Sequence, residues 1–396
     1  MKKIALGIAI LSAIVFTSCT SDDDSPTPKA EIKAPATYVF DRNGNSSVSF
    51  SGQTARIKMA NELGSALKDN SKTKIQLDAM FADGTGFEDA DLNTSGKKIR
   101  NKTAASKDFF GANTTDAAAI KEQFDGWIAL QVSEVFENWT NEASKGNAGF
   151  LQEAGGGSTR YINSKGLEYN QAFAKSLIGA LMADQILNNY LSPAVLDAGD
   201  NKKDNDATTL KEGKDYTLME HKWDEAYGYL YGNEDNPAVP VLGADSYLNK
   251  YLGKVESDTD FTGIATDIYN AFKLGRAAIV GKDYVLRNKQ ADIIREKIST
   301  AIAIRAVFYL QAGKSNLGTD NAGAFHDLSE GYGFIFSLQF TRKPGTTEPY
   351  FTKQEVDRFL DQLMVEGGFW DLTPETLDTI SEAIAAKFDF TVEQAK

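Results

Sequence analysis

The 396-residue sequence contains a single cysteine, Cys19, so no disulfide can form within the chain. It also has only nine prolines and two histidines. Because proline interrupts helices, its scarcity allows long uninterrupted helical segments. After the N-terminal stretch, no run of about 18 apolar residues occurs, and we therefore expect no membrane-spanning helix in the body of the chain.

Positive charge is also in deficit. Lys and Arg total 42 whereas Asp and Glu total 55, which gives a formal net charge of −13. Proteins that bind nucleic acids cluster Lys and Arg against phosphates, so we expect no nucleic-acid partner. Hydrophobic residues make up 42% of the chain and charged residues 24%, as is typical of a globular protein. The length allows one large domain or two of medium size.

Residues 1–18 have the features of a signal peptide. Two lysines precede an apolar stretch, residues 4–16, which is too short to cross a bilayer and is typical of a signal-peptide core. Small residues then precede Cys19, an arrangement that resembles the lipobox of bacterial lipoproteins. The resemblance implies that Cys19 becomes the lipidated N-terminus and anchors the chain to a membrane. The alternative is an ordinary secretory signal followed by a free thiol.

Residues 19–35 are polar, acidic and punctuated by proline, which is typical of a flexible tether. The acidic run Asp22-Asp23-Asp24 also resembles the export signal that sends some Gram-negative lipoproteins to the outer face of the outer membrane. We therefore expect a lipid-anchored outer-membrane protein that is exposed at the cell surface. A solvated spacer without any export role is the alternative.

Residues 36–396 have mainly helical periodicity. Extended segments at 38–40 and 48–50 flank turn residues and predict a small hairpin. No series of alternating strands follows, so we expect an all-α, antiparallel helical bundle. The expected helices cover about 52–69, 115–139, 167–191, 217–231, 259–280, 285–312, 322–341, 353–366 and 373–388, with loops at 155–158 and 197–216.

Both histidines stand in a repeated pattern. The segments that begin at His221 and His326 share a Glu at i+4, Tyr-Gly at i+6 and i+7, and then an aromatic, an aliphatic and an aromatic residue. A chance match is on the order of one in ten thousand, so we interpret the segments as duplicated helices. They predict two related halves, about 36–250 and 251–396, around a pseudo-twofold axis.

Helical spacing determines what each histidine can reach. Residues i and i+4 share a face, so His221 can contact Glu225 and His326 can contact Glu330. If the pseudo-twofold axis brings the pairs together, they offer nitrogen and oxygen ligands to a divalent metal or iron. The alternative is structural, with each imidazole bonded only to its neighbouring acid.

Two glycines and two arginines accompany these pairs. Gly228 and Gly333 occupy i+7 of the same stripe, and glycine costs a helix about 1 kcal/mol relative to alanine. We therefore expect a crossing helix or a ligand to approach the backbone there. A buried carboxylate also needs a positive partner. Arg305, on an otherwise apolar helical stripe, and Arg276 are the expected charge partners of the glutamates in the two pairs.

The lipoprotein-like start, the helical chain and the duplicated His/Glu motif together resemble imelysin-like proteins. This resemblance implies a helical fold and a role in bacterial iron uptake. More narrowly, three segments resemble an uncharacterised family of envelope lipoproteins allied to the imelysins. These segments are Gly166–Gln171, Asp184–Leu191 and Lys222–Tyr229.

The chain departs from the imelysin-like hallmark, Gly-x-His-x-x-Glu. Here the glutamate follows the histidine at i+4, and Met219 occupies the glycine position of the first copy. The resemblance therefore implies site residues only at His221 with Glu225 and, more weakly, at His326 with Glu330.

Three functions are compatible with these features. The first is a surface-displayed, imelysin-like binding lipoprotein that acquires iron or another nutrient, together with an outer-membrane transporter. The second is a metal-dependent hydrolase, although the sequence has no His-Glu-x-x-His and no Gly-x-Ser-x-Gly motif. The third is a glycan-binding partner of such a transporter, although its tryptophans fall mostly on helical core stripes. These features favour binding over catalysis.

Overall fold

The computed structural model describes residues 31–396, so the expected signal peptide, Cys19 and most of the expected tether lie outside the described residues. Ile32–Lys396 form one compact unit. Its first residues already contact the body, since Ile32 packs on Gly281. In addition, the Lys273 ammonium donates a 3.0 Å hydrogen bond to the Ala36 carbonyl. The folded body therefore starts a few residues earlier than the sequence predicted.

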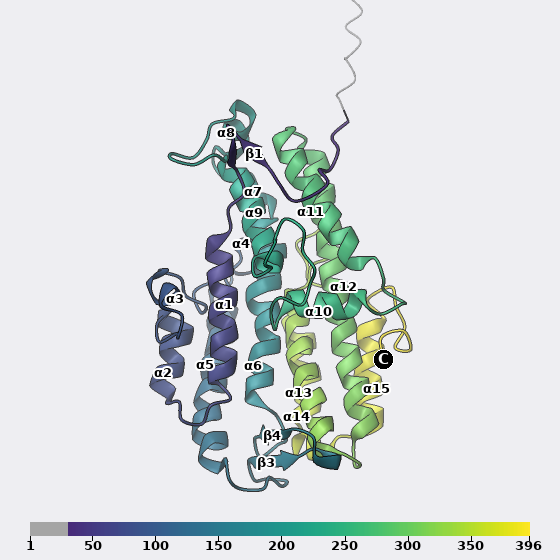
Figure 1. Ribbon diagram of the computed structural model, residues 1–396. Helices are drawn as coiled ribbons and strands as arrows, with labels where there is room; N and C mark the ends of the chain where they lie inside the picture. Colours follow the sequence, from purple (N-terminus) through teal and green to yellow (C-terminus); the bar gives the residue numbers. More distant parts are fainter. Residues whose placement is uncertain (1–30) are drawn as a thin grey trace, which may run out of the picture. The chain divides into compact units, whose positions relative to one another are not determined.

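The described chain is predominantly helical, which confirms the predicted all-α fold class (Figure 1). Threonine caps begin several of the helices, as capping boxes at Thr73, Thr217 and Thr352 illustrate. The α-helices are α1 (Ser51–Ala66), α2 (Lys74–Asp78), α3 (Ala90–Thr94), α4 (Lys107–Phe110), α5 (Thr114–Leu130), α6 (Tyr169–Leu177), α7 (Pro193–Leu196), α8 (Asn201–Ala207), α9 (Leu218–Tyr231), α10 (Leu248–Glu256), α11 (Ile264–Val280), α12 (Tyr284–Asn316), α13 (Asn321–Ser337), α14 (Lys353–Met364) and α15 (Pro374–Ala385).

Segments of other helical types extend several of these helices. The longest is the π-helical segment η5 (Ile178–Tyr190), which continues α6 without a break. The remaining π-helical segments are η1 (Ala79–Asp83) and η2 (Gln131–Val135), and the 3-10 segments are η3 (Phe136–Asn138), η4 (Ala154–Gly156), η6 (Leu338–Phe340) and η7 (Gly368–Asp371). No helix in the described residues is both long and apolar enough to cross a membrane.

The predicted hairpin is present, with its strands closer to the turn than expected. β1 (Asp41–Arg42) pairs antiparallel with β2 (Asn45–Ser46). Asn43 and Gly44 form the turn with φ of 54° and 82°, backbone angles that asparagine and glycine tolerate best. A second hairpin, of β3 (Gly149–Gln152) and β4 (Thr159–Ile162), was not predicted, because only its glycine loop stood out in the sequence.

The long helices lie side by side and enclose a continuous apolar core (Figure 1). α11, α12 and α13 follow one another through short turns and pack together, and α13 also packs along α6. The predicted boundary between two halves falls inside α10. Because α6 of the first half packs on α13 of the second, the repeat does not produce two separate units. The predicted loop at 197–216 also contains the short helix α8.

Candidate functional site

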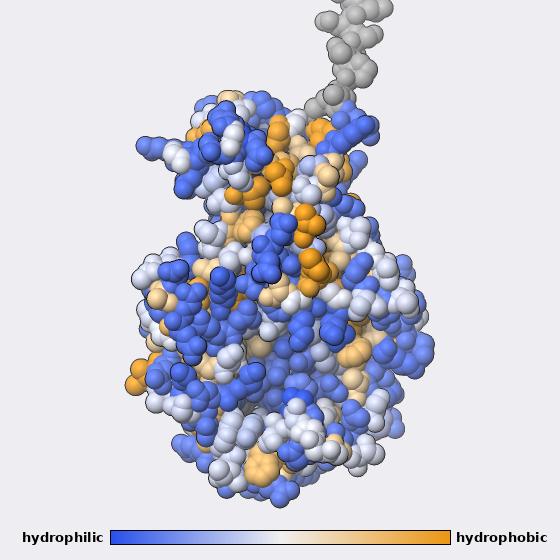
Figure 2. Space-filling view, in the orientation of Figure 1, coloured by the Kyte–Doolittle hydropathy of each residue, from blue (hydrophilic) through white to orange (hydrophobic). Residues whose placement is uncertain are grey.

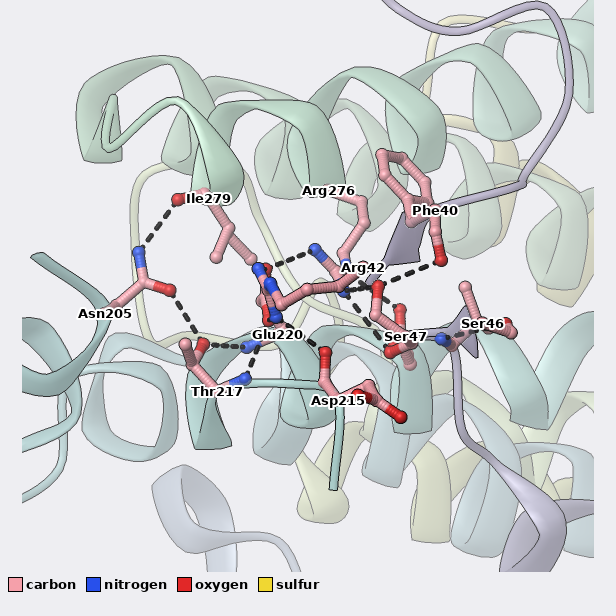
Figure 3. A network of polar contacts seen from close by, with 12 residues as sticks. Phe40, Arg42, Ser46, Ser47, Asn205, Asp215, Thr217, Glu220, Arg276 and Ile279 are labelled. Atoms are coloured by element: carbon pink, nitrogen blue, oxygen red, sulfur yellow. Dashed lines mark hydrogen bonds and ion pairs between the residues drawn. The ribbon is translucent and has the colours of Figure 1, made fainter. Parts of the chain in front are cut away.

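The first repeated helix, α9, presents an acidic face to its neighbours. Thr217 caps the helix, and the Glu220 carboxylate accepts a 2.7 Å hydrogen bond from the Thr217 backbone N–H. Arg42 from β1 donates two hydrogen bonds to that carboxylate, at 2.7 and 2.8 Å. Arg276 from α11 also reaches this carboxylate, at 3.0 Å (Figure 3). Glu220 therefore joins the hairpin, α9 and α11.

Arg276 is fully buried and holds two acids of α9. Besides Glu220, its Nε donates to Asp224 at 3.0 Å, and a terminal nitrogen reaches the Ser47 hydroxyl at 3.2 Å. The Tyr38 hydroxyl also donates to Asp224, at 2.8 Å. Burial raises the pKa of Asp224 to about 6, against the opposing charge of Arg276.

The prediction that Arg276 pairs with Glu225 or Glu330 is therefore wrong. Glu220 and Asp224 form one i,i+4 stripe of α9, and this stripe faces α11. Glu225 stands about 100° further around the helix and faces α1 instead. Sequence spacing identified a carboxylate partner for Arg276 but placed it on the adjacent stripe.

The first predicted pair is held mainly by other side chains. His221 Nε2 lies 3.9 Å from a Glu225 oxygen, which is too far for a hydrogen bond. Lys222 contacts Glu225 at 2.6 Å, and Gln53 from α1 donates to it at 3.1 Å. Burial lowers the pKa of His221, whose ring stacks on Tyr216 with centroids 4.6 Å apart. The imidazole thus rests on an aromatic ring, and burial disfavours its charged form.

The second pair lies in a different set of contacts. His326 Nδ1 lies 3.0 Å from Glu168, the residue that precedes α6, whereas its Nε2 is 3.7 Å from Glu330. Glu330 also accepts a 3.0 Å hydrogen bond from Tyr251 and forms an ion pair with Lys175 at 3.4 Å. Burial favours protonation of Glu330, but the nearby Lys175 and His326, together with hydrogen bonds from Tyr309 and Tyr251, outweigh it and lower the pKa. Neither Glu168 nor Lys175 could be identified from the sequence as a partner, because both are far from His326 along the chain.

The structure does not assemble His221, Glu225, His326 and Glu330 into one metal centre. Among the described residues, no group of three or more His, Cys, Asp or Glu side chains is arranged to hold a metal ion. The first pair packs against α1 and the second against α6. The repeat therefore reproduces a local packing arrangement twice, and each copy neutralises its own charges.

The repeated glycines have the predicted role of permitting close approach. A Cβ on Gly228 would lie 2.3 Å from the Phe50 Cβ at the start of α1. A Cβ on Gly333 would lie 2.4 Å from the Lys175 Cβ and 2.9 Å from the Ser176 nitrogen of α6. Of the two predicted alternatives, a crossing helix and a ligand, the structure shows neighbouring protein segments in both copies.

Arg305 does not pair with Glu225 or Glu330 either, which corrects that prediction. It is 7% exposed, and the described residues place no carboxylate within ion-pair distance of its guanidinium. Instead, its guanidinium carbon lies 3.9 Å from the ring centroid of Phe308 and 4.6 Å from that of Tyr309. Arg305 is thus buried among aromatic rings, and the ion-pair partner of Glu330 is Lys175.

A cleft beside the N-terminal hairpin was not predicted. Its volume is about 740 Å³, and its floor contains Tyr38 stacked flat on Tyr227 with centroids 3.6 Å apart. Val39 of the lining is 48% exposed, and Val239 and Val241, which follow the lining residue Ala238 in the chain, are exposed by 48% and 85%. Figure 2 shows hydrophobic side chains gathered on this face, over α9 and the segment that follows it. The lining comprises Tyr38, Val39, Asp41, Ser46, Val48, Ser49, Phe50, Ser51, Thr54, Tyr227, Gly232, Asn236, Pro237 and Ala238.

Comparison with known proteins identifies the chain at the level of family. No curated protein and no solved structure matches it. One family model matches residues 35–391, which is nearly the whole described body. The predicted relation to imelysin-like proteins stays a prediction. The protein belongs to the family described as Domain of unknown function (DUF4856).

Proposed function

We propose that the protein is a lipid-anchored binding protein of the bacterial envelope, and that the cleft beside the N-terminal hairpin holds its ligand. The cleft carries this proposal. Its volume of about 740 Å³ lies in the range of small-molecule sites, and aromatic and hydroxyl side chains line it. The stack of Tyr38 on Tyr227 makes the floor rigid, so the site is largely formed before a ligand arrives.

The lining indicates the class of ligand. Asp41 is the only charged residue among the lining side chains, which include no cation. Serine and threonine hydroxyls offer hydrogen bonds beside the rings of Tyr38 and Phe50. An uncharged, partly apolar molecule suits this surface better than a free ion. Such a ligand is compatible with the acquisition of an iron compound or another nutrient, and the imelysin-like resemblance implies iron uptake.

The contacts of the two His–Glu pairs support binding over hydrolysis. A hydrolase needs a carboxylate that is free to act as a general base. Glu225 is engaged by Lys222 and Gln53, and Glu330 has close contacts of its own. Glycan binding through exposed tryptophans is also disfavoured, because Trp127 and Trp223 are buried.

Ligand entry is tested with N-phenyl-1-naphthylamine, a neutral apolar dye whose fluorescence rises on binding. We expect saturable binding of one dye per chain. Ser51→Trp should abolish it, because Ser51 lines the cleft and the indole would fill it. Ser65→Trp, at the other end of α1, is the matched control and should bind as the unchanged protein does. Unsaturable binding, or equal binding by both variants, would contradict the proposal.

The lipid anchor is tested separately. Bacteria that express the full-length chain should attach an alkyne-labelled fatty acid to it and retain it in the membrane fraction. Cys19→Ser should lose both the label and the membrane association, because no other cysteine exists in the chain. A labelled Cys19→Ser protein, or an unlabelled original chain, would refute the anchor without bearing on the cleft.

A further inference from the structure

A second hollow in the protein, independent of the cleft, surrounds Arg305. Its volume is about 420 Å³, and it lies where α10 crosses α12 near the end of the chain (Figure 1). Apolar groups form much of its surface. Its lining comprises Lys254, Val255, Ser257, Asp258, Ile304, Arg305, Phe308, Tyr309 and Ala395.

Arg305 differs from the other buried arginines in what surrounds its guanidinium. A buried cation is normally compensated by a carboxylate or by several carbonyl oxygens. The other buried arginines of the described residues have such partners: Arg56 has the carbonyls of Gly52 and Lys98, Arg276 has Glu220 and Asp224, Arg287 has Asp197, Arg295 has Asp292, and Arg342 has Asp108.

The head of Arg305 meets aromatic rings and one neutral hydroxyl, that of Tyr309. Its Nε is buried without a hydrogen-bond partner. Aromatic faces attract a cation, but they do not accept hydrogen bonds in the plane of the guanidinium. The Arg305 guanidinium is therefore packed against aromatic rings, and its Nε donor has no hydrogen-bond acceptor.

We propose that this hollow binds an oxyanion, a carboxylate or a phosphate group of a small molecule, on Arg305. The planar guanidinium matches such groups, since it can donate two parallel hydrogen bonds. Lys254 adds a second positive charge at the exposed edge, and Ser257 adds a hydroxyl. The ring of Phe308 and the side chain of Ile304 provide an apolar surface for the rest of the ligand.

Asp258 is the one acid in the lining, and it supplies a sharp test. Its carboxylate accepts a 3.0 Å hydrogen bond from the Asp260 backbone N–H, and it forms no ion pair with Arg305 or Lys254 in the described structure. If the hollow binds an oxyanion, Asp258 repels it. If no oxyanion binds in the hollow, the removal of Asp258 leaves the response to anions unchanged.

The experiment uses calorimetric titration of the purified full-length chain in phosphate-free chloride buffer. The probes are benzoate, inorganic phosphate and, as the neutral control, benzamide. We expect saturable binding of benzoate or phosphate at millimolar concentration and no binding of benzamide. Binding of benzoate alone identifies a carboxylate ligand with an apolar part, and binding of phosphate alone identifies a phosphate. Binding of neither, or of benzamide as tightly as benzoate, overturns the proposal.

Variants locate the binding. Arg305→Met should weaken the binding of the anion by more than about thirtyfold, as expected when a buried charge partner is removed. Lys254→Gln should weaken anion binding about two- to fivefold, and Asp258→Asn should strengthen anion binding by a similar factor. Lys58→Gln, which removes an exposed charge on α1, should change nothing. If Arg305→Met fails to fold, the opposite effects of Lys254→Gln and Asp258→Asn on anion affinity still test the proposal. Unchanged affinity in both refutes the site.

Discussion

Arg276→Met should destabilise the protein by about 3–5 kcal/mol, the usual effect of removing one member of a buried ion pair. The guanidinium is fully buried and lies 3.0 Å from both Glu220 and Asp224. Methionine retains an unbranched apolar stem, so the loss of charge dominates over the loss of packing. In the variant Glu220 keeps Arg42, whereas Asp224 keeps only the Tyr38 hydroxyl.

The loss should depend on pH in a defined direction. The pKa of Asp224 is already raised to about 6 by burial, and the loss of Arg276 raises it further. The folded state then binds this proton more tightly than the unfolded chain, where the pKa of Asp is about 3.9. Stability therefore falls as pH rises from about 4 to the folded pKa. The deficit of the variant should be larger at pH 8 than at pH 5.

Urea denaturation followed by circular dichroism measures both quantities. Arg100→Met is the matched control, because Arg100 pairs with Asp125 at 2.6 Å but both side chains are about one-third exposed, at 33% and 36%. Its removal should change stability by no more than about 1 kcal/mol. If Arg276→Met behaved like this control, or if its deficit were equal at pH 5 and pH 8, the assignment of a buried charge network would be incorrect.

Two further predictions concern the second repeated helix. Gly333→Ala should lower the melting temperature, because the new Cβ would lie 2.4 Å from the Lys175 Cβ. The control is Gly126→Ala in α5, whose new Cβ would meet nothing within 4 Å and which should stabilise the protein by up to about 1 kcal/mol. Equal effects of the two substitutions on stability would refute the close approach at Gly333. Glu330→Gln removes the counter-charge of Lys175, whose pKa burial already lowers. Up to about pH 10 the folded state of this variant then binds fewer protons than its unfolded state, so its free energy of unfolding rises with pH. Chemical denaturation should therefore show a loss of stability, relative to the unchanged protein, that shrinks between pH 7 and pH 10. A loss of stability that is constant over this range would contradict the reasoning.

The fold was largely predictable because helical periodicity is a local signal. Apolar residues at i, i+3 and i+4 placed α12 and α13 within a few residues of their observed ends. The misses lie where the signal is short. α10 has only nine residues, fewer than the window of about 11 to 18 residues over which helical periodicity is recognised, and β3 and β4 have four each, the shortest run in which alternation can be recognised.

The candidate site was predictable only in part, because partners come from distant segments. The repeat identified the buried acidic helices and both glycines at close contacts. It did not identify Glu168, which is separated from His326 by 158 positions. Nor did it distinguish Asp224 from Glu225 as the partner of Arg276. That choice depends on which side of α9 faces α11, and rotation about a helix axis is fixed by tertiary packing.

The distribution of buried charge separates the parts of this molecule that maintain the fold from those available to a ligand. In the repeated helices, Glu220 and Asp224 are balanced by arginines, and Glu330 is balanced by Lys175. Charges that are balanced internally gain little from an external partner, so substitutions there should change stability and leave ligand binding intact. Arg305 has no such balance among the described residues, and the cleft of Tyr38 has an open apolar surface. Substitutions at these two places should therefore change binding more than stability, and a ligand search should begin with them.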